Sequence, residues 1–499
     1  MTYLSPLDTS FLDLEDSDPH ASLAIASLCV IDGPAPGQAE FADAIRERLP
    51  LVPKYRQRVV RVPFNLGHPV WVDEPHVDLD YHLRRTALPE PGDEATLCRL
   101  VARVMSQRLD RDRPLWEYWL VEGLPHGQWA LLSKVHHCVV DGVSGNELYR
   151  LMLDTTPERR PPVADTWQPC REPGTLALLA DAVGQMVSGG VDQARMLVDA
   201  LHTPARLARR IGDTAQGLAT LAGALIPTVP SSLIGPIGRS RRYAVVRAPL
   251  ARLRDPAKAL DATINDVVLA VLAGAVRAVM LARGEDPAPN AVRTLVPVNV
   301  RSEHETGIID NRVSMMLPML PVDQVDPVER VRIVHERVAA LRASHEIEAT
   351  ASMTELARYE PFAPIAAGIR AALRLPQHIV AATITNVPGP RQQLYALGRP
   401  IREILPYVPI GNRMRLGVSV LTYGGQASFG ITADFDTFPE VEFFAEAITA
   451  ELAALARQTS DRRHAARRRA VRQTMPAAHA VPIVPAVPVV PVVPVVPAG

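Results

Sequence analysis

Apolar residues in the first 165 positions alternate between short continuous runs and helical spacings. Short apolar runs bounded by turn residues favour buried strands, whereas apolar residues three and four positions apart favour amphipathic helices. Strand-like runs occupy residues 22–31, 67–72, 116–121 and 129–135, and helical spacing marks residues 40–49 and 96–107. We expect a mixed α/β domain over residues 1–165, in which the strand at 116–121 pairs beside the strand at 129–135.

Residues 241–458 show the same mixture and are expected to form a second α/β domain. Strand-like runs occupy residues 294–301, 379–387, 416–421 and 429–433. Helical spacing marks residues 326–342, residues 441–456 and a long apolar stretch that ends at Leu281. Asn265 and Asp266 precede that stretch, and either side chain can cap its first turn.

Two segments outside these domains differ in composition. Residues 166–240 contain Ala- and Leu-rich stretches at 176–198 and 205–225, and we expect a helical crossover between the domains. The alternative is a helical face that lies on a membrane surface. Residues 459–499 hold an arginine cluster, which fits a solvated helix end or an anionic-lipid contact, and then a Pro/Val repeat. Frequent proline prevents helix and sheet formation, so this tail is expected to be disordered.

The composition fits a globular protein. Of the 499 residues, 47% are hydrophobic and 21% are charged, which allows large buried cores. A net charge of -1 gives no global attraction to nucleic acid. The N-terminus has no basic and apolar signal sequence, and no transmembrane helix is expected. Isolated cysteines indicate reduced thiols and a cytoplasmic location; they are Cys29, Cys98, Cys138 and Cys170.

The main candidate for chemistry is the stretch His136-His137-Cys138-Val-Val-Asp141-Gly142, which follows the strand at 129–135. Asp141 and Gly142 indicate a turn, and helical spacing resumes over residues 148–152. A strand end that leads into a helix holds side chains rigidly and leaves the turn open to substrate. The simpler interpretation is a pair of histidines buried in the core.

Two other interpretations of the motif are weaker. A zinc site needs three or four ligands, and no Cys-x-x-Cys or His-Glu-x-x-His accompanies the pair, so no metal is expected. Cys138 next to His137 could form a Cys–His nucleophile. Adjacent residues on a strand point to opposite faces, however, which argues against that pairing.

Six further motifs accompany the histidine pair in a fixed order, and the set resembles the bacterial wax ester synthase/diacylglycerol acyltransferase family. They are Leu4-Ser-Pro-Leu-Asp8-x-x-Phe11, Arg113-Pro-Leu-Trp116, Asn265-Asp266-Val-Val-Leu269, Pro297-Val-Asn299-Val-Arg301, Asn386-Val-Pro-Gly-Pro390 and Phe429-Gly-Ile-Thr-Ala-Asp434. The family is similar in fold to chloramphenicol acetyltransferase, plant acyltransferases and peptide-synthetase condensation domains. The resemblance implies two α/β domains with an active-site tunnel between them.

The resemblance assigns roles to the motif residues. His137 is implied to be the general base, which a histidine can serve near neutral pH. His136 is implied to orient backbone or substrate, and Asp141 to form a structural ion pair for which Arg301 is the candidate partner. Gly142 permits the tight turn.

Residues of the second domain are implied to support the reaction. Asn265 resembles the family residue that faces the histidine and stabilises the oxyanion, although it could be a plain helix cap. Asp266, Asn299 and Asn311 are supporting or structural candidates. The family usually has a Gly-Asn pair where this chain has Asp310-Asn311, so the effect of Asp310 on rate or acceptor preference is open.

The implied function is transfer of a long-chain acyl group from acyl-CoA to diacylglycerol, a fatty alcohol or both. The thioester is already activated, so neither a covalent acyl-enzyme nor a cofactor is required. The expected setting is the surface of a membrane or lipid inclusion. Two alternatives stay open: a condensation-type enzyme that uses carrier-bound thioesters, and a non-catalytic lipid-binding relative. Acyl chain length and oligomeric state are not fixed by the sequence.

Overall fold

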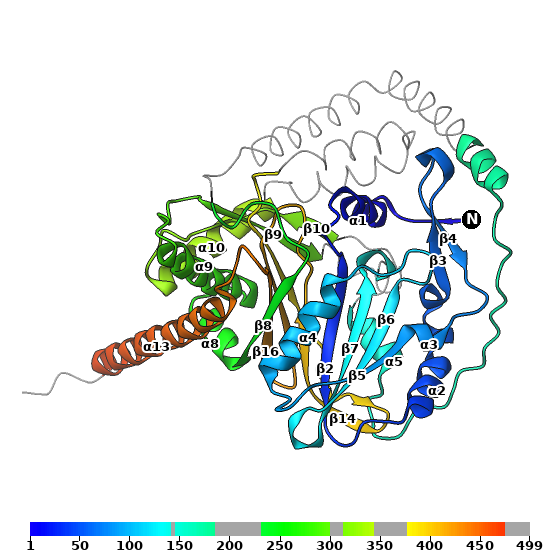
Figure 1. The fold of residues 1–499 in the computed structure, drawn as a ribbon. Helices are drawn as coiled ribbons and strands as arrows, with labels where there is room; N and C mark the ends of the chain where they lie inside the picture. The colour runs from blue at the N-terminus through cyan, green and yellow to red at the C-terminus, as the bar shows by residue number, and fades with distance from the viewer. Residues whose placement is uncertain (141–144, 185–230, 300–312, 344–376, 475–499) are drawn as a thin grey trace, which may run out of the picture.

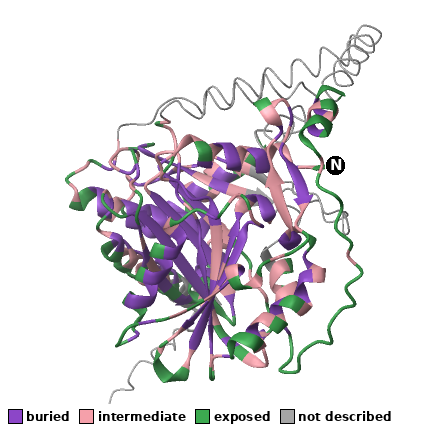
Figure 2. Ribbon diagram, turned by 45° about the vertical axis from the view of Figure 1, so that its right-hand side comes forward, coloured by how far each residue is buried: buried purple, intermediate pink, exposed green. Residues whose placement is uncertain are grey.

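The computed structural model contains two large central sheets with helices packed around them (Figure 1). It describes residues 1–140, 145–184, 231–299, 313–343 and 377–474. Buried residues concentrate in the strands of both sheets (Figure 2). Two separate clusters of buried apolar side chains form the cores, as expected from the two α/β regions of the sequence.

The first large sheet holds the histidine pair at the end of a central strand. Its strands, in order, are β13 (Tyr395–Ala396), β14 (Arg399–Tyr407), β2 (Ala24–Ile31), β7 (Trp129–His136), β6 (Trp116–Glu122) and β5 (Leu83–Ala87). β7 pairs antiparallel with both β2 and β6, which confirms the predicted pairing. A small sheet of β1 (Thr2–Tyr3), β4 (Val70–Asp73) and β3 (Gln57–Val60) completes this half.

The second large sheet belongs to the C-terminal half. Its strands, in order, are β10 (Val313–Met316), β9 (Val292–Asn299), β12 (Ala382–Val387), β15 (Leu416–Tyr423), β16 (Gln426–Asp434) and β8 (Arg241–Pro249), with β11 (Met319–Leu320) beside β9. Four helices pack with it: α8 (Ala251–Ala259), α9 (Ile264–Ala282), α10 (Pro327–Ala343) and α13 (Val441–Thr474). Among the described helices, α9 alone is long and apolar enough to cross a membrane, and most of it is buried inside this core.

β14 departs from the expected division of the chain at residue 240. It lies in the C-terminal half of the sequence but pairs antiparallel with β2 of the first sheet. β14 passes close to β16 of the second sheet. A Cβ on Gly430 of β16 would lie 1.7 Å from the carbonyl oxygen of Pro406 on β14. Only glycine avoids that collision. The two halves are therefore joined by a shared strand as well as by the crossover segment.

Helices also surround the first sheet, and one near the N-terminus was not predicted from the sequence. α4 (Glu94–Ser106) packs on β2 and β8 and so contacts both large sheets. The structure adds α1 (Pro6–Ser17), which the sequence analysis did not predict, and places α2 (Gln38–Arg48) and α5 (Gly145–Met152) in this half.

The segments outside the two domains are only partly described. α13 continues to Thr474, so residues 459–474 are helical, which corrects the expectation of a disordered tail from residue 459. The Pro/Val repeat lies outside the described residues. A helix at Thr175–Gly184 agrees with the start of the first predicted crossover helix, and most of that segment is not described.

Candidate active site

The two histidines lie where β7 ends and a short 3-10 helix, η5 (His137–Val139), begins. The backbone on both sides holds this junction. The N–H of His136 donates to the carbonyl of Leu115 (3.0 Å), and the N–H of His137 donates to the carbonyl of Leu23 (3.2 Å). Neighbouring segments therefore fix the position at which each imidazole leaves the backbone.

Trp116 anchors one of those segments. Its side chain is fully buried, and its indole N–H donates to the carbonyl of Tyr55 at 2.9 Å. The rings of Tyr55 and His82 stack against the indole, with centroid distances of 4.7 and 4.2 Å. The Arg113-Pro-Leu-Trp116 motif thus supports the carbonyl of Leu115 and, through it, the end of β7.

His137 is half-buried and packs against α1. Its ring centroid lies 4.0 Å from that of Phe11, with the planes tilted by 32°. Ser5 caps the start of α1: its Oγ accepts a hydrogen bond from the backbone N–H of Asp8 at 3.1 Å. The Leu4-Ser-Pro-Leu-Asp8-x-x-Phe11 motif therefore caps a helix and places an aromatic ring against His137.

His136 is 1% exposed, so its imidazole is enclosed by the protein. Its Nδ1 accepts from the backbone N–H of Cys138 at 3.3 Å and lies 3.0 Å from Cys138 Sγ. Its Nε2 lies 3.6 Å from Oε2 of Glu15. An accepting Nδ1 leaves the proton on Nε2, facing the carboxylate. Burial lowers the pKa of His136, and Glu15 opposes that shift only in part.

Glu15 is a buried carboxylate that connects α1 to the histidine pair. Its Oε1 accepts from the backbone N–H of Leu23 at 2.9 Å, and its Oε2 pairs with Arg111. Burial raises the pKa of Glu15, but the contact with His136, the guanidinium of Arg111 and the N–H of Leu23 outweigh it and bring the pKa to about 2. The carbonyl of the same Leu23 accepts from His137. Glu15 therefore contacts His136 directly and is connected to the backbone of His137 through Leu23.

Cys138 is not arranged as a nucleophile. It belongs to η5 rather than to a strand, so the strand-face argument does not apply, and its sulfur lies against His136. Burial raises the pKa of the Cys138 thiol well above its ordinary value. A protonated, buried thiol is a poor nucleophile.

Asn265 and Asp266 lie in the first turn of α9, in the second half of the chain. Thr263 caps this helix, which corrects the expectation that Asn265 or Asp266 is the cap. Asp266 completes a capping box: its Oδ2 accepts from the N–H of Thr263 at 2.9 Å and from His335 Nδ1, 2.8 Å away. These contacts give Asp266 a structural role. Asn265 is half-buried, and its oxyanion role stays a prediction.

Several predicted residues cannot be placed. Asp141, Gly142, Arg301 and Asn311 lie outside the described residues, as does Asp310. Asn299 ends β9 and pairs with Val313, but its side chain is not described. The proposed Asp141–Arg301 ion pair therefore stays a prediction. Within the described ranges, no group of three or more His, Cys, Asp or Glu side chains is placed to hold a metal ion.

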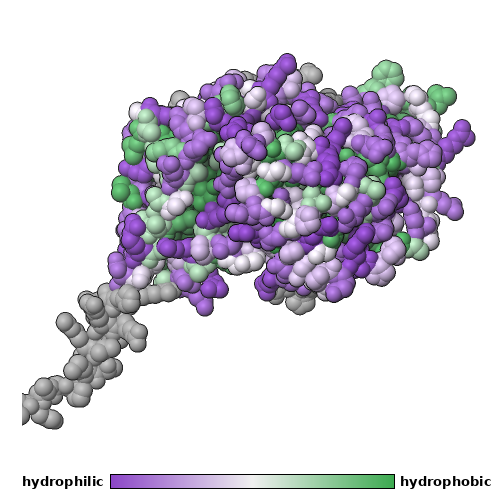
Figure 3. All heavy atoms as spheres, turned by 60° about the horizontal axis from the view of Figure 1, so that its bottom comes forward, coloured by the Kyte–Doolittle hydropathy of each residue, from purple (hydrophilic) through white to green (hydrophobic). Residues whose placement is uncertain are grey.

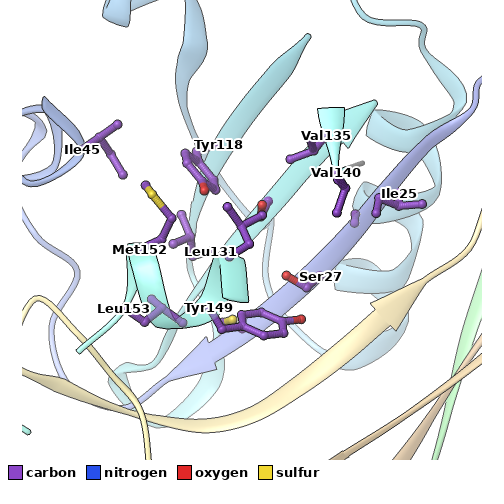
Figure 4. A pocket seen from close by; sticks show the side chains of 14 residues that line it. Ile25, Ser27, Ile45, Tyr118, Leu131, Val135, Val140, Tyr149, Met152 and Leu153 are labelled. Atoms are coloured by element: carbon purple, nitrogen blue, oxygen red, sulfur yellow. The ribbon is translucent and has the colours of Figure 1, made fainter. Parts of the chain in front are cut away.

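An apolar cavity of about 110 Å³ begins next to the histidine pair (Figure 4). β2, β6, β7 and α5 form its walls. Val135, directly before the motif, and Val140, within it, lie at one end, and Ile45 and Met152 lie at the other (Figure 4). Voids in protein cores are seldom much larger than a water molecule. The cavity therefore offers space in which an apolar group can bind.

Sequence reasoning found the histidines and Phe11 but missed Glu15, Arg111 and the cavity. Glu15 follows Phe11 by about one helical turn, so recognising the helix at 6–17 would have placed both on one side of it. No local pattern pointed to Arg111. The cavity depends on contacts between distant strands and helices, which periodicity does not reveal.

Comparison with known proteins identifies the family. The profile described as the wax ester synthase/diacylglycerol acyltransferase catalytic domain matches residues 4–268, and the profile of the WS/DGAT C-terminal domain matches residues 309–456. The Mycobacterium tuberculosis protein tgs1, named a probable diacylglycerol O-acyltransferase, is 39% identical over 94% of this chain and 98% of its own length.

Solved structures agree with this assignment. The wax ester synthase/diacylglycerol acyltransferase from Marinobacter aquaeolei VT8 superposes with a TM-score of 0.62 and 26% identity, covering 92% of this chain and 100% of that one. The first condensation domain of the calcium-dependent antibiotic synthetase shares the fold, with a TM-score of 0.57 and 18% identity over 91% of this chain and 97% of its own. The chain therefore belongs to the wax ester synthase/diacylglycerol acyltransferase family.

Proposed function

We propose that this protein transfers a long-chain fatty acyl group from acyl-CoA to the hydroxyl of diacylglycerol, with His137 as the general base. The proposal is carried by the half-buried imidazole at the end of β7, beside an apolar cavity that begins at Val135 and Val140. An imidazole suits proton removal near neutral pH, and an apolar cavity suits a hydrocarbon chain.

The reaction proceeds in one exchange at the thioester carbon. His137 removes the hydroxyl proton as the alcohol oxygen attacks, and the carbonyl oxygen takes up negative charge. The C–S bond then breaks, the ester forms, and the CoA thiolate recovers the proton from His137. Asn265 is the proposed donor to the oxyanion. The Asp141–Arg301 pair is the proposed support for the turn behind the base.

Diacylglycerol is the preferred acceptor in this proposal because tgs1 and other M. tuberculosis relatives carry that activity in their names. The Marinobacter structure is named for wax ester synthesis as well, so a fatty alcohol is a second acceptor to test. Both acceptors present a hydroxyl to the same base.

The proposal also includes a peripheral contact with a lipid surface, because diacylglycerol resides in membranes and lipid inclusions. The face shown in Figure 3 is mostly hydrophilic, with hydrophobic residues in small groups. Phe64 is 85% and Leu176 is 82% exposed. Phe64 lies in the turn between β3 and β4 of the small sheet, and the helix that carries Leu176 packs on the same sheet through Leu178. Exposed large apolar side chains of this kind favour insertion into a lipid interface.

The test is an assay of purified protein with palmitoyl-CoA and diacylglycerol, followed by measurement of free CoA and triacylglycerol. Parallel reactions replace diacylglycerol with hexadecanol, and palmitoyl-CoA with a palmitoyl carrier-protein thioester. Triacylglycerol formed from palmitoyl-CoA supports the proposal. Turnover of the carrier thioester alone would favour the condensation-type alternative, and no turnover of either donor would favour a lipid-binding relative.

A further inference from the structure

A second hollow, distinct from the apolar cavity, lies between the two halves of the molecule. It has a volume of about 1050 Å³ and is formed by α4, the start of β8 and the first turns of α13. Its lining is rich in arginine, and the residues used below are Arg99, Arg103, Gln107, Arg239, Arg242 and Glu442. We call this hollow the arginine groove.

Most guanidinium groups in the arginine groove are not neutralised by carboxylates. Arg99 donates to Thr96 Oγ1, and Arg242 donates to the carbonyl of Phe435. Within the described ranges, neither of them, nor Arg103 or Arg239, has a carboxylate oxygen within 4.0 Å, although Asp93 interacts electrostatically with Arg99 and Glu440 with Arg242 at longer range.

The carboxylates in the lining are fewer than its arginines. Glu94, at one edge, pairs with Arg247, and Arg241 lies 3.8 Å from Asp434. Glu442 is the remaining carboxylate in the lining. Arg99 and Arg103 of α4, Arg239 in the loop before β8 and Arg242 of β8 thus line one solvent-accessible space, which favours an anion with several charges.

One end of the arginine groove lies close to the histidine pair. Gln107 lines that end, and its carbonyl accepts a hydrogen bond from Ser22 Oγ at 3.1 Å. The next residue along the chain, Leu23, accepts from the N–H of His137. Ser22 and Leu23 therefore separate the groove from the base.

The groove and the apolar cavity lie on opposite faces of β7. Leu131, Ser133 and Val135 face the cavity, whereas Lys134 points the other way and donates to the carbonyl of Val104 on α4. Successive side chains of a strand alternate between faces, so this division follows from the register. His137 lies at the strand end, between the two spaces.

We propose that the arginine groove binds the phosphate groups of CoA, namely the diphosphate and the ribose 3′-phosphate. This inference rests on the proposed function, because it concerns the donor of that reaction. Guanidinium groups match phosphate oxygens in charge and geometry. A CoA thioester carries its phosphates at one end of the flexible pantetheine arm and its acyl group at the other. Phosphates in the groove would leave the arm free to reach His137 and the acyl chain free to enter the cavity.

The test uses the full chain and the double variant Arg99→Glu/Arg103→Glu, in which two exposed side chains on one face of α4 reverse charge. Binding of adenosine 3′,5′-bisphosphate is measured by calorimetry, and kcat/KM is measured for palmitoyl-CoA and for palmitoyl-pantetheine, which lacks the nucleotide. We expect the Kd for the bisphosphate to rise at least about tenfold, and the preference for palmitoyl-CoA over palmitoyl-pantetheine to fall by a similar factor. The double variant Arg252→Glu/Lys258→Glu, an equal charge change at two exposed positions of α8 outside the groove, should match the wild type in both.

An unchanged bisphosphate Kd in a folded double variant would overturn the inference. Weaker binding to anionic vesicles with an unchanged bisphosphate Kd would also overturn it and would assign the arginines to lipid headgroups. The bisphosphate-binding result can be distinguished from a failure of the proposed acyl transfer. His137→Ala should bind the bisphosphate like the wild type, and bisphosphate binding that depends on Arg99 and Arg103 would support the groove even if palmitoyl-CoA were not turned over.

Discussion

Nε2 of His136 lies 3.6 Å from Oε2 of Glu15, and this contact joins the end of β7 to α1. The other oxygen of the same carboxylate accepts from Leu23 N–H, while the Leu23 carbonyl accepts from His137 N–H. The buried first histidine and the half-buried second histidine are therefore held by one network. We interpret His136 and Glu15 as positioning residues. His137 is the residue proposed to remove the proton from the substrate.

The variant Glu15→Gln tests that positioning role. The amide keeps the size of the side chain but removes the charge that Arg111 and His136 face. We expect kcat to fall while KM for palmitoyl-CoA changes little, because the base is displaced and the donor site is not. The free energy of unfolding should fall by about 1.5–3 kcal/mol, the usual contribution of a hydrogen bond to a charged group. Steady-state kinetics and urea denaturation measure the two effects.

Asp16→Asn is the matched control for Glu15→Gln. Asp16 is the next residue on α1 and also pairs with Arg111, at 3.4 Å, but its carboxylate is 48% exposed. Exposed pairs contribute less than about 1 kcal/mol, so stability and kcat should stay near the wild-type values. Equal effects of the two variants would argue against a special role for Glu15.

Acid sensitivity should also depend on Glu15. Its pKa of about 2 in the folded protein lies below its ordinary value of 4.5, so the unfolded chain takes up the proton first as the pH falls. The stabilisation by Glu15 is complete above pH 4.5 and is lost between 4.5 and about 2, with a total near 3 kcal/mol. Glu15→Gln should remove this part of the dependence of the unfolding free energy on pH. Denaturation midpoints measured from pH 6 to pH 3 (roughly the accessible window) compare the two proteins; parallel curves would contradict the assignment.

Acyl chain length should depend on the cavity end opposite the histidines. Met152→Trp fills that end, so the rate with palmitoyl-CoA should fall by about tenfold or more while the rate with octanoyl-CoA changes little. Overpacking costs about 1–3 kcal/mol, so the melting temperature is measured in parallel.

Met152→Leu conserves volume and is the control for the cavity. It should retain the chain-length profile of the wild type. If Met152→Trp folds and lowers the rates with both donors equally, the acyl chain does not occupy this cavity.

Lipid-surface contact should depend on Phe64 and Leu176. Replacing both with serine removes two exposed apolar side chains, and we expect at least about tenfold weaker binding to vesicles that contain diacylglycerol. Vesicle flotation measures this. Val325→Ser, which removes an apolar side chain that is 71% exposed in the other half of the chain, is the control. Unaltered flotation of the Phe64/Leu176 variant would exclude this region as the contact.

Local patterns in the sequence predicted the strands around the histidine pair and the position of the pair at a strand end. They did not predict that β14 joins the first sheet, because an apolar strand pattern does not specify its partner, and the requirement for Gly430 follows from that crossing. Glu15 was missed for a similar reason. Its importance comes from Arg111, Leu23 and His136, which are distant from it in sequence or belong to other elements.

Removal of the acceptor proton by His137 is tested by the kcat of His137→Ala with palmitoyl-CoA and diacylglycerol. His137 is half-buried, so the variant should keep the circular dichroism spectrum and melting temperature of the wild type. We expect kcat to fall by about 100- to 10,000-fold, the usual contribution of a general base. A folded His137→Ala protein that retains most of its rate would contradict the assignment of His137 as the base.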